Sequence, residues 1–152
     1  MQFRAMPADR PPASDLIEAM IVDLVPLYGR IDGAGAPRAT PEDFAPPRGV
    51  FLVGYDDAGR AVCGGGVKRL GDEVGEIKRM FVVPEARGRG VARELLVALE
   101  DAARELGYTR VRLDTGPKQP HAEALYRSAG YLDIPDYNGN PHASYFAEKA
   151  LR

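Results

Sequence analysis

Glycine, arginine and small side chains come together in residues 84–92, in an order that can hold an anion. The segment reads Pro-Glu-Ala-Arg87-Gly88-Arg89-Gly90-Val91-Ala92. Glycine lets a ligand approach the backbone closely, and the first turn of a helix presents unpaired N–H groups with a partial charge of about +0.5. Arg87, Arg89 and Arg93 add positive charge. The segment therefore predicts a phosphate-binding site at a helix N-terminus.

Two familiar phosphate-binding patterns do not fit this segment. A dinucleotide-binding loop needs a third small residue, but Gly88-x-Gly90-x-x leads to Arg93. A Walker loop needs Gly-Lys-Ser/Thr, which does not occur in the chain. A basic turn without a ligand is the simpler alternative, but the strand before the segment and the helix after it favour an anion site.

A family resemblance covers this segment and a second one downstream. Residues 76–96, which contain Arg87-x-x-Gly90-x-Ala92, resemble the central motif of the GNAT superfamily of acetyl-CoA-dependent N-acetyltransferases. Residues 122–131 are similar to the family's Ala-x-x-Leu-Tyr-x-x-x-Gly-(Phe/Tyr) helix. The two motifs have the separation that the family shows, so the resemblance extends over nearly the whole chain.

The resemblance implies where acetyl-CoA binds. The pantetheine arm would lie along the strand that ends near Val83 and bond to its peptide groups, and the pyrophosphate would sit on the N–H groups of residues 88–93. Gln119 stands where many members have an asparagine that contacts the cofactor. The implied binding residues are Met80, Phe81, Val82, Arg87, Gly88, Arg89, Gly90, Val91, Ala92, Arg93 and Gln119.

Two residues are assigned catalytic roles. The resemblance implies that Tyr126 is the general acid for the departing thiolate, and a phenol with a pKa of about 10 keeps its proton at neutral pH. Glu76 is our candidate for the base that takes a proton from the incoming amine, directly or through water. The alternative for Tyr126 is a core aromatic, and for Glu76 an ion pair with a neighbouring cation; Glu123 and Asp114 are further candidates for the base.

The elements that must position these residues follow from the apolar periodicity. Strands are predicted at residues 2–5, 50–55, 60–70, 73–83, 110–115 and 144–151, and helices from Ser14 to about Pro26, from Thr40, at 88–106 and at 120–129. Strand alternation predicts that Glu76, Lys78, Met80 and Val82 share one face. We expect a mixed α/β fold: a mostly antiparallel sheet, helices on both faces and a parallel pair at the cofactor site, in a single domain of residues 1–152.

Irregular segments are expected to form the walls of the acceptor site. These are residues 28–49 and 135–142, the second with Tyr137, Asn138 and His142. Cys63, the chain's single cysteine, is expected to pack as a small hydrophobe because nothing near it in sequence would activate it. Direct transfer in a ternary complex is therefore preferred over a covalent acyl-enzyme.

Composition excludes several classes of function. The chain has 152 residues, 20 basic and 22 acidic side chains and a net charge of −2, which disfavours a nucleic-acid binder. With one cysteine and two histidines, a zinc site is not expected. No apolar stretch reaches the length of a membrane span or a signal peptide, so we expect a cytoplasmic protein without a membrane partner.

The predicted function is transfer of an acetyl group from acetyl-CoA to the primary amine of a small molecule or peptide. The alternative is a non-catalytic acyl-CoA-binding or sensor module with the same fold. A homodimer is compatible with the resemblance, and neither a metal nor a nucleic acid is expected.

Overall fold

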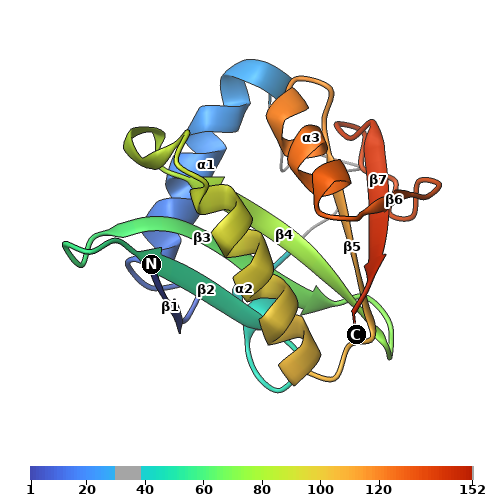
Figure 1. Cartoon of the computed structure of the whole chain (residues 1–152), viewed down its shortest axis with the longest axis horizontal. Helices are drawn as coiled ribbons and strands as arrows, with labels where there is room; N and C mark the ends of the chain where they lie inside the picture. The colour runs from blue at the N-terminus through green and yellow to red at the C-terminus, as the bar shows by residue number, and fades with distance from the viewer. Residues whose placement is uncertain (30–38, 152) are drawn as a thin grey trace.

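A seven-stranded sheet runs through the protein (Figure 1). The structure is a computed structural model that describes residues 1–29 and 39–151. The strand order is β1-β2-β3-β4-β5-β7-β6, and every pair is antiparallel except β4–β5. The strands are β1 (Gln2–Ala5), β2 (Val50–Tyr55), β3 (Ala61–Arg69), β4 (Val74–Val82), β5 (Arg110–Thr115), β6 (Leu132–Asp133) and β7 (Tyr145–Ala150).

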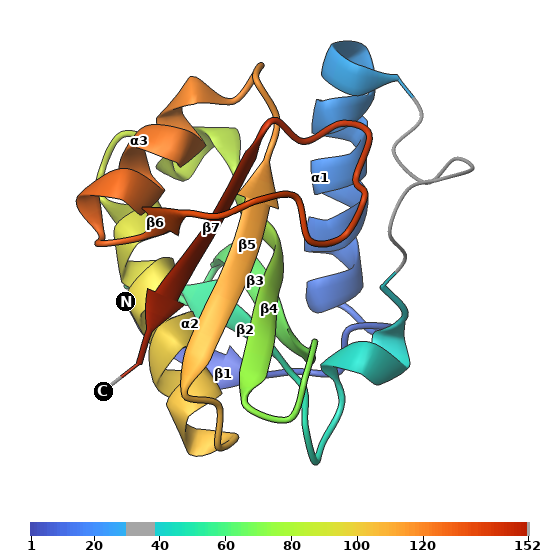
Figure 2. The ribbon, with the colours of Figure 1, turned by 90° about the vertical axis from the view of Figure 1, so that its right-hand side faces the viewer.

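Helices cover both faces of this sheet (Figure 2). Helix α1 (Ala13–Tyr28) and the short 3₁₀ helix η1 (Pro41–Phe44) lie on one face. Helices α2 (Val91–Glu105) and α3 (Pro120–Ser128) lie on the other, and the one-turn η2 (Pro84–Ala86) connects β4 to α2. Each face has its own apolar core, so the predicted mixed fold with helices on both faces and one parallel pair is confirmed.

The best-patterned helix forms where its apolar residues predict it. Val91, Leu95, Leu99 and Ala103 are buried against the sheet, since side chains three and four apart share one side of a helix. The helix closes before Gly107, whose φ of +94° favours glycine.

Three local features differ from the prediction. Helix α1 begins at Ala13, one residue before the predicted start at Ser14, and Pro12 is its N-cap, without a side-chain cap. Pro26 lies inside the last turn of α1, which continues to Tyr28. The two-residue strand β6 has no counterpart among the predicted elements, because its exposed residues carry no alternation to detect.

A β-bulge in β4 changes which face its side chains occupy. Lys78 pairs with Gly66 and Phe81 with Gly64, so the ladder shifts by one residue between these two pairs. Arg79 within the shift has a φ of +59°. Ile77, Met80 and Val82 consequently face the α2 core and Phe81 faces the α1 core.

The prediction that Glu76, Lys78, Met80 and Val82 share one face is therefore wrong for the second half of the strand. Glu76 and Lys78 lie in one phase of the alternation, and Met80 and Val82 lie in the other. An inserted residue breaks the period of two.

Strands β4 and β5 separate soon after they pair. Their parallel register runs from Val74–Arg110 to Glu76–Arg112 and then stops, although both strands continue. The backbone of β4 beyond Glu76 is consequently unpaired on its β5 side. This parting of two adjacent strands creates the space in which the candidate site lies.

Candidate active site

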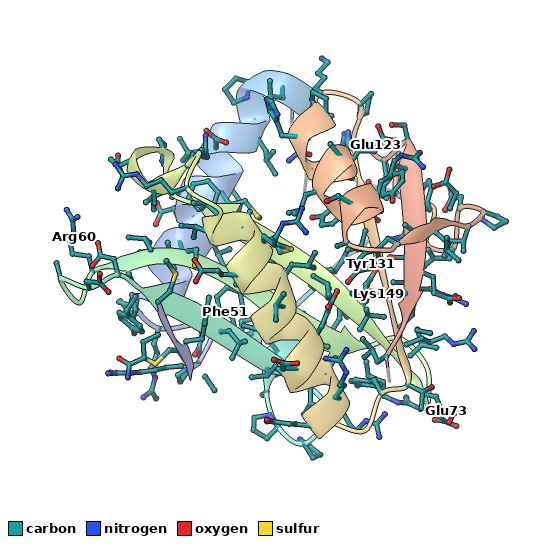
Figure 3. All side chains as sticks on the ribbon, in the orientation of Figure 1. Phe51, Arg60, Glu73, Glu123, Tyr131 and Lys149 are labelled. Atoms are coloured by element: carbon teal, nitrogen blue, oxygen red, sulfur yellow. The ribbon has the colours of Figure 1, made fainter. Side chains whose placement is uncertain are left out.

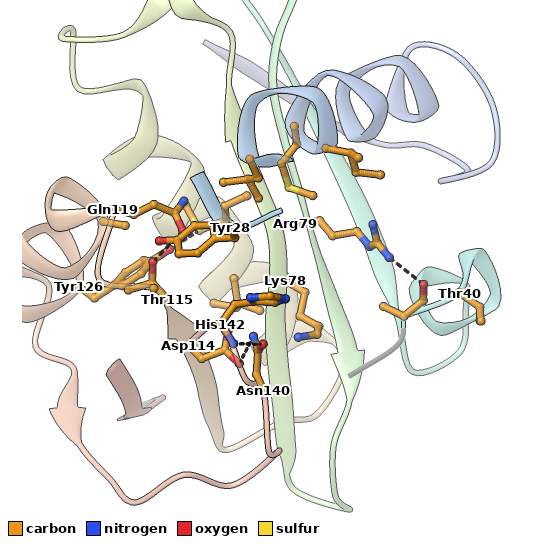
Figure 4. Close-up of a pocket in the computed structure, with 18 of the residues that line it drawn as sticks. Tyr28, Thr40, Lys78, Arg79, Asp114, Thr115, Gln119, Tyr126, Asn140 and His142 are labelled. Atoms are coloured by element: carbon orange, nitrogen blue, oxygen red, sulfur yellow. Dashed lines mark hydrogen bonds between the residues drawn. The ribbon is translucent and has the colours of Figure 1, made fainter. Parts of the chain in front are cut away.

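A cavity of about 670 Å³ lies between the separated strands β4 and β5. Its walls come from α1, the start of η1, the middle of β4, the end of β5, α3 and the segment before β7 (Figure 4). This volume is in the range of small-molecule sites. Met80, Gln119 and Tyr126, three of the predicted site residues, line it.

The start of α2 is open to an anion. Gly88 and Gly90 have φ values of +79° and +78°, and Gly90 is the N-cap. Glu94 N–H makes the first helical hydrogen bond, to Gly90 O at 3.2 Å, and no side chain caps the helix. The N–H groups of residues 91–93 precede that bond, so they are available to a ligand. These open N–H groups, called the anion cradle below, have the arrangement with which helix N-termini bind phosphate.

The three arginines around this turn have different environments. Arg87 donates to Val82 O at 2.9 Å and Asp23 Oδ2 at 3.3 Å and lies over the Phe81 ring, so it ties β4 to α1. Arg93 donates to Ser128 Oγ at 2.5 Å. Arg89 is exposed and, within residues 1–29 and 39–151, makes no ion pair. It is the arginine most free to meet a phosphate.

Tyr126 lies on α3 with its hydroxyl aimed at β4. The side chain is 7% exposed, and its Oη donates to Met80 Sδ at 3.6 Å. Its ring stacks on Tyr145 and contacts Tyr131. Burial, reinforced by the negative charge of Asp114, raises the pKa of Tyr126 above the ordinary value of 10. The phenol therefore keeps its proton at neutral pH and can donate it.

A buried ionic cluster fixes the position of Tyr131, whose ring contacts that of Tyr126. Tyr131 Oη donates to Glu100 Oε2 at 2.7 Å, and Lys149 Nζ donates to Glu100 Oε1 at 3.0 Å. Figure 3 shows Tyr131 and Lys149 together beside α2. The cluster links α2, β7 and the turn after α3, and so fixes the ring against which Tyr126 packs.

The other predicted cofactor residues occupy two surfaces. Met80 and Val82 face the α2 side, whereas Phe81 is buried on the α1 side and does not line the cavity. Gln119 is the N-cap of α3 and accepts from Thr115 Oγ1 at 3.4 Å. Its amide therefore lies at the end of β5, on the wall of the cavity.

Glu76, the predicted base, is 2% exposed and heavily bonded. Its Oε2 accepts from Tyr137 Oη at 2.7 Å and Asn138 Nδ2 at 3.2 Å. Lys78 lies 3.6 Å from Oε2 and Lys68 3.8 Å from Oε1. Glu76 does not line the cavity, so it lies one layer behind it.

Asp114, a secondary candidate in the sequence analysis, lines the cavity directly. Its Oδ2 accepts from Asn138 Nδ2 at 2.5 Å and Asn140 Nδ2 at 3.5 Å. The Asn138 amide thereby bridges the two candidate bases, Glu76 and Asp114. The third candidate, Glu123, instead pairs with Arg127 on α3.

The predicted walls are only partly confirmed: Tyr137 and Asn138 do not line the cavity and instead donate to Glu76 behind it. Asn140 and His142 line the cavity, and the His142 ring lies 5.9 Å from that of Tyr28, at the end of α1. Tyr28 Oη in turn accepts from Lys118 N–H at 3.0 Å. Residues 30–38 of the other predicted wall lie outside the described residues.

Sequence reasoning missed Arg79, which lines the cavity from the bulge of β4. The signal was the pair Lys78-Arg79 within a strand, but strict alternation assigns neighbours to opposite faces. Across residues 1–29 and 39–151, no group of three or more His, Cys, Asp or Glu side chains could hold a metal. In the same ranges no helix is long and apolar enough to cross a membrane.

Known proteins similar to this chain are acetyltransferases. Residues 17–131 match the Acetyltransferase (GNAT) family. The IAA acetyltransferase of Azospirillum brasilense is 38% identical over 112 residues, 72% of this chain and 73% of that protein. The uncharacterized N-acetyltransferase YjgM of Escherichia coli is 36% identical over 95 residues, 60% of this chain and 55% of that protein.

Solved structures agree on the fold. A GNAT-family acetyltransferase from Staphylococcus aureus superposes with a TM-score of 0.79 at 20% identity, over 99% of this chain and 100% of that one. A GNAT acetyltransferase from Elizabethkingia anophelis with acetyl-CoA bound gives 0.71 at 16% identity, over 99% and 97%. The chain belongs to the GNAT family, and the prediction that it is an acyltransferase enzyme is confirmed.

Proposed function

Starting from membership of the GNAT family, we propose that the protein moves an acetyl group from acetyl-CoA to a primary amine by direct transfer. The observation that carries the proposal is a buried tyrosine hydroxyl, that of Tyr126, which donates to Met80 Sδ at the wall of a cavity between parted strands. A cavity bordered by this side chain, together with an anion cradle at the start of α2, suits a two-substrate reaction.

The residues present fit acetyl-CoA. The unpaired edge of β4 after Glu76 offers peptide groups to the pantetheine amides, and the open N–H groups of residues 91–93 offer donors to the pyrophosphate. Arg89 adds charge there. When bound, acetyl-CoA supplies the activated acyl thioester. Acetyl-CoA or CoA in related structures supports this assignment.

Tyr126 is proposed to hydrogen-bond and protonate the leaving sulfur. Its hydroxyl already donates to a thioether, Met80 Sδ, so its position suits a sulfur acceptor. Burial keeps the proton on oxygen, because it penalises the phenolate. A properly placed general acid contributes about 10²–10⁴-fold to a rate.

The proton of the amine is proposed to leave through the carboxylates bridged by Asn138. Glu76 remains the predicted base, acting through water because it lies behind the cavity. Asp114 is the competing assignment, favoured by its place on the cavity wall. An ammonium bound against Asp114 could pass its proton to that carboxylate directly.

Cys63 supports direct transfer rather than an acyl-enzyme. It is fully buried on β3 and burial raises its pKa to about 11, so its thiol is not ionised at neutral pH. No route through it is proposed. The cytoplasmic location, the single domain, the homodimer and the absence of a metal or nucleic-acid partner remain predictions from sequence.

The test is an acceptor screen with acetyl-CoA in which released free thiol is followed. We expect acetyl-CoA to raise the melting temperature and at least one primary amine to accelerate thiol release. Acetyl-CoA binding without thiol release across a broad amine panel would contradict the proposal and favour a sensor module. Mass spectrometry of the product, showing acetyl on nitrogen, separates transfer from thioester hydrolysis.

A further inference from the structure

We propose that the amine acceptor also carries a carboxylate, which Arg79 binds on the wall of the cavity opposite Asp114. The inference rests on the acetyl transfer proposed above and names its substrate class: amino acids or related amino carboxylates. It starts from the bulge in β4, which brings an extra cation to the cavity.

The bulge directs two neighbouring cations to the same cavity. In regular β-structure Lys78 and Arg79 would point to opposite faces. The one-residue shift and the left-handed backbone of Arg79, with a φ of +59°, interrupt that alternation, and both residues line the cavity. A non-glycine residue in this conformation is uncommon and costs free energy, so the site maintains it against a local preference.

Within residues 1–29 and 39–151, Arg79 has no counter-ion at ion-pair distance. Its Nη2 donates to Ala39 O at 2.8 Å, which is a neutral acceptor. Among the residues that the structure describes, no carboxylate lies within 4.0 Å of its guanidinium. Asp43 favours its charged form from farther away, but that carboxylate already accepts from Thr40 N–H. In the part of the chain that the structure describes, four of the five guanidinium N–H donors thus have no protein acceptor.

The other charged side chains described near this wall do not neutralise the positive charge of Arg79. Glu76 is shared by Lys68 and Lys78, so one carboxylate faces two ammonium groups. Arg79 is then a further cation, half-buried and only partly solvated. Desolvation lowers the pKa of Arg79 relative to an exposed arginine, which is the direction that a bound anion would reverse.

The cavity is charged differently at its two ends. Figure 4 shows Asp114 and Tyr126 on one side of the β4 ribbon and Arg79, bonded toward the η1 segment, on the other. An amine group would lie at Asp114, beside the Tyr126 hydroxyl. An anionic group on the same molecule would then meet Arg79. A guanidinium offers two parallel N–H donors that match a carboxylate, so this class of anion fits best.

The experiment compares acceptors that differ only in the carboxylate. Free amino acids are paired with their amides and with their decarboxylated amines, for example lysine with cadaverine and phenylalanine with phenethylamine. We expect kcat/KM to be at least 10-fold higher for the carboxylate member. O-phosphoethanolamine is included because a guanidinium also binds phosphate.

Variants then assign the preference to Arg79. Arg79→Asn removes the charge and uses a residue that tolerates the left-handed backbone. We expect it to raise KM for the carboxylate acceptor at least 10-fold while leaving kcat and the acetyl-CoA affinity within 2-fold. Arg79→Lys keeps the charge but loses the two parallel N–H donors of the guanidinium. Its KM for the carboxylate acceptor should therefore lie between that of the wild type and that of Arg79→Asn. Arg69→Gln, an exposed strand arginine that pairs with Asp72, is the matched control and should change nothing.

The possible results distinguish a failure of the carboxylate assignment from a failure of the proposed acetyl transfer. Equal or faster acetylation of amides and decarboxylated amines would overturn the inference and leave acetyl transfer intact. Faster acetylation of O-phosphoethanolamine than of every carboxylate would overturn the carboxylate assignment. An unchanged KM in a folded Arg79→Asn protein, verified by acetyl-CoA-dependent melting, would remove Arg79 from the site. If no primary amine is acetylated although acetyl-CoA binds, the proposed function fails first and the inference with it.

Discussion

The two ends of the candidate site, the start of α2 and the acceptor cavity, use different kinds of binding group. At the start of α2 the binding groups are backbone N–H groups, and the special requirement on sequence is glycine where φ is positive. At the acceptor end the groups are side chains from β4, β5 and the segment before β7, held by one another. A backbone site is a local feature, whereas a side-chain site depends on contacts between distant segments.

This contrast separates affinity from turnover. Changes at the α2 end should alter acetyl-CoA binding and leave the chemical step intact. Changes at the acceptor end should alter kcat or the acceptor KM and leave acetyl-CoA binding intact. Tyr126 lines the cavity and is proposed to act on the leaving sulfur itself, so it provides the strongest test.

The largest effect is expected for Tyr126→Phe. Loss of the hydroxyl removes the proposed general acid, so kcat should fall about 10²–10⁴-fold while the acetyl-CoA affinity stays constant. Because burial raises the pKa of Tyr126 above 10, the loss should be the same from pH 7 to about 9.5, measured with a good acceptor. Wild-type turnover in the variant would show that the phenol is only a packing residue.

The next effect distinguishes the two bridged carboxylates. Asp114→Asn should lower kcat/KM for the amine about 10–10²-fold, because its carboxylate lines the cavity. Glu76→Gln should chiefly lower stability, by about 3 kcal/mol, since it leaves two lysines without their buried partner. Initial rates and chemical denaturation measure the two quantities. A larger rate loss in a stable Glu76→Gln protein would restore Glu76 as the base.

A smaller effect tests the backbone cradle. Gly90→Ala places a side chain at a φ of +78°, which costs about 1–2 kcal/mol or distorts the turn, so acetyl-CoA should bind about 10-fold more weakly by calorimetry. Gly59→Ala is the matched control, since Gly59 has a φ of +77° in the turn between β2 and β3. Both variants should lose similar stability. Equal affinity loss in the two would argue against the cradle.

The smallest effect is expected for Arg89→Gln. The exposed charge of Arg89 should strengthen acetyl-CoA binding about 3-fold at low salt and less at 0.5 M salt, because salt screens exposed charges. The variant, which lacks this charge, should therefore bind acetyl-CoA more weakly by these factors. Arg87→Gln should instead lower stability, since Arg87 joins β4 to α1 through Val82 and Asp23. A salt-independent loss of affinity in Arg89→Gln would mean a direct, desolvated contact.

The same contrast explains what could be predicted from the sequence. The turn at residues 84–92 and helix α2 follow from glycines and apolar periodicity that lie close together in the chain. The strand positions and the parallel pair also follow from local patterns. The Asn138 bridge between Glu76 and Asp114 does not, because its partners are 62 and 24 residues away.

Arg79 shows a second limit. Alternation is the only rule that a strand pattern offers, and a bulge violates it without a proline or glycine to mark the position. The three glycines opposite, Gly64 to Gly66, are explained by close packing; a Cβ on Gly66 would come within 2.3 Å of the Phe44 ring. Nothing in that run specifies where the register shifts.

The change of register within β4 also constrains how this strand can vary in length. Removing one residue at the bulge would restore an uninterrupted period, and the side chains after it would exchange layers. Phe81 would leave the α1 core for the α2 core, and Met80 would withdraw its sulfur from Tyr126. Substitutions in β4 can be absorbed one at a time, but a single deletion rearranges both cores and the catalytic contact together. The length of this strand is therefore under tighter constraint than its composition.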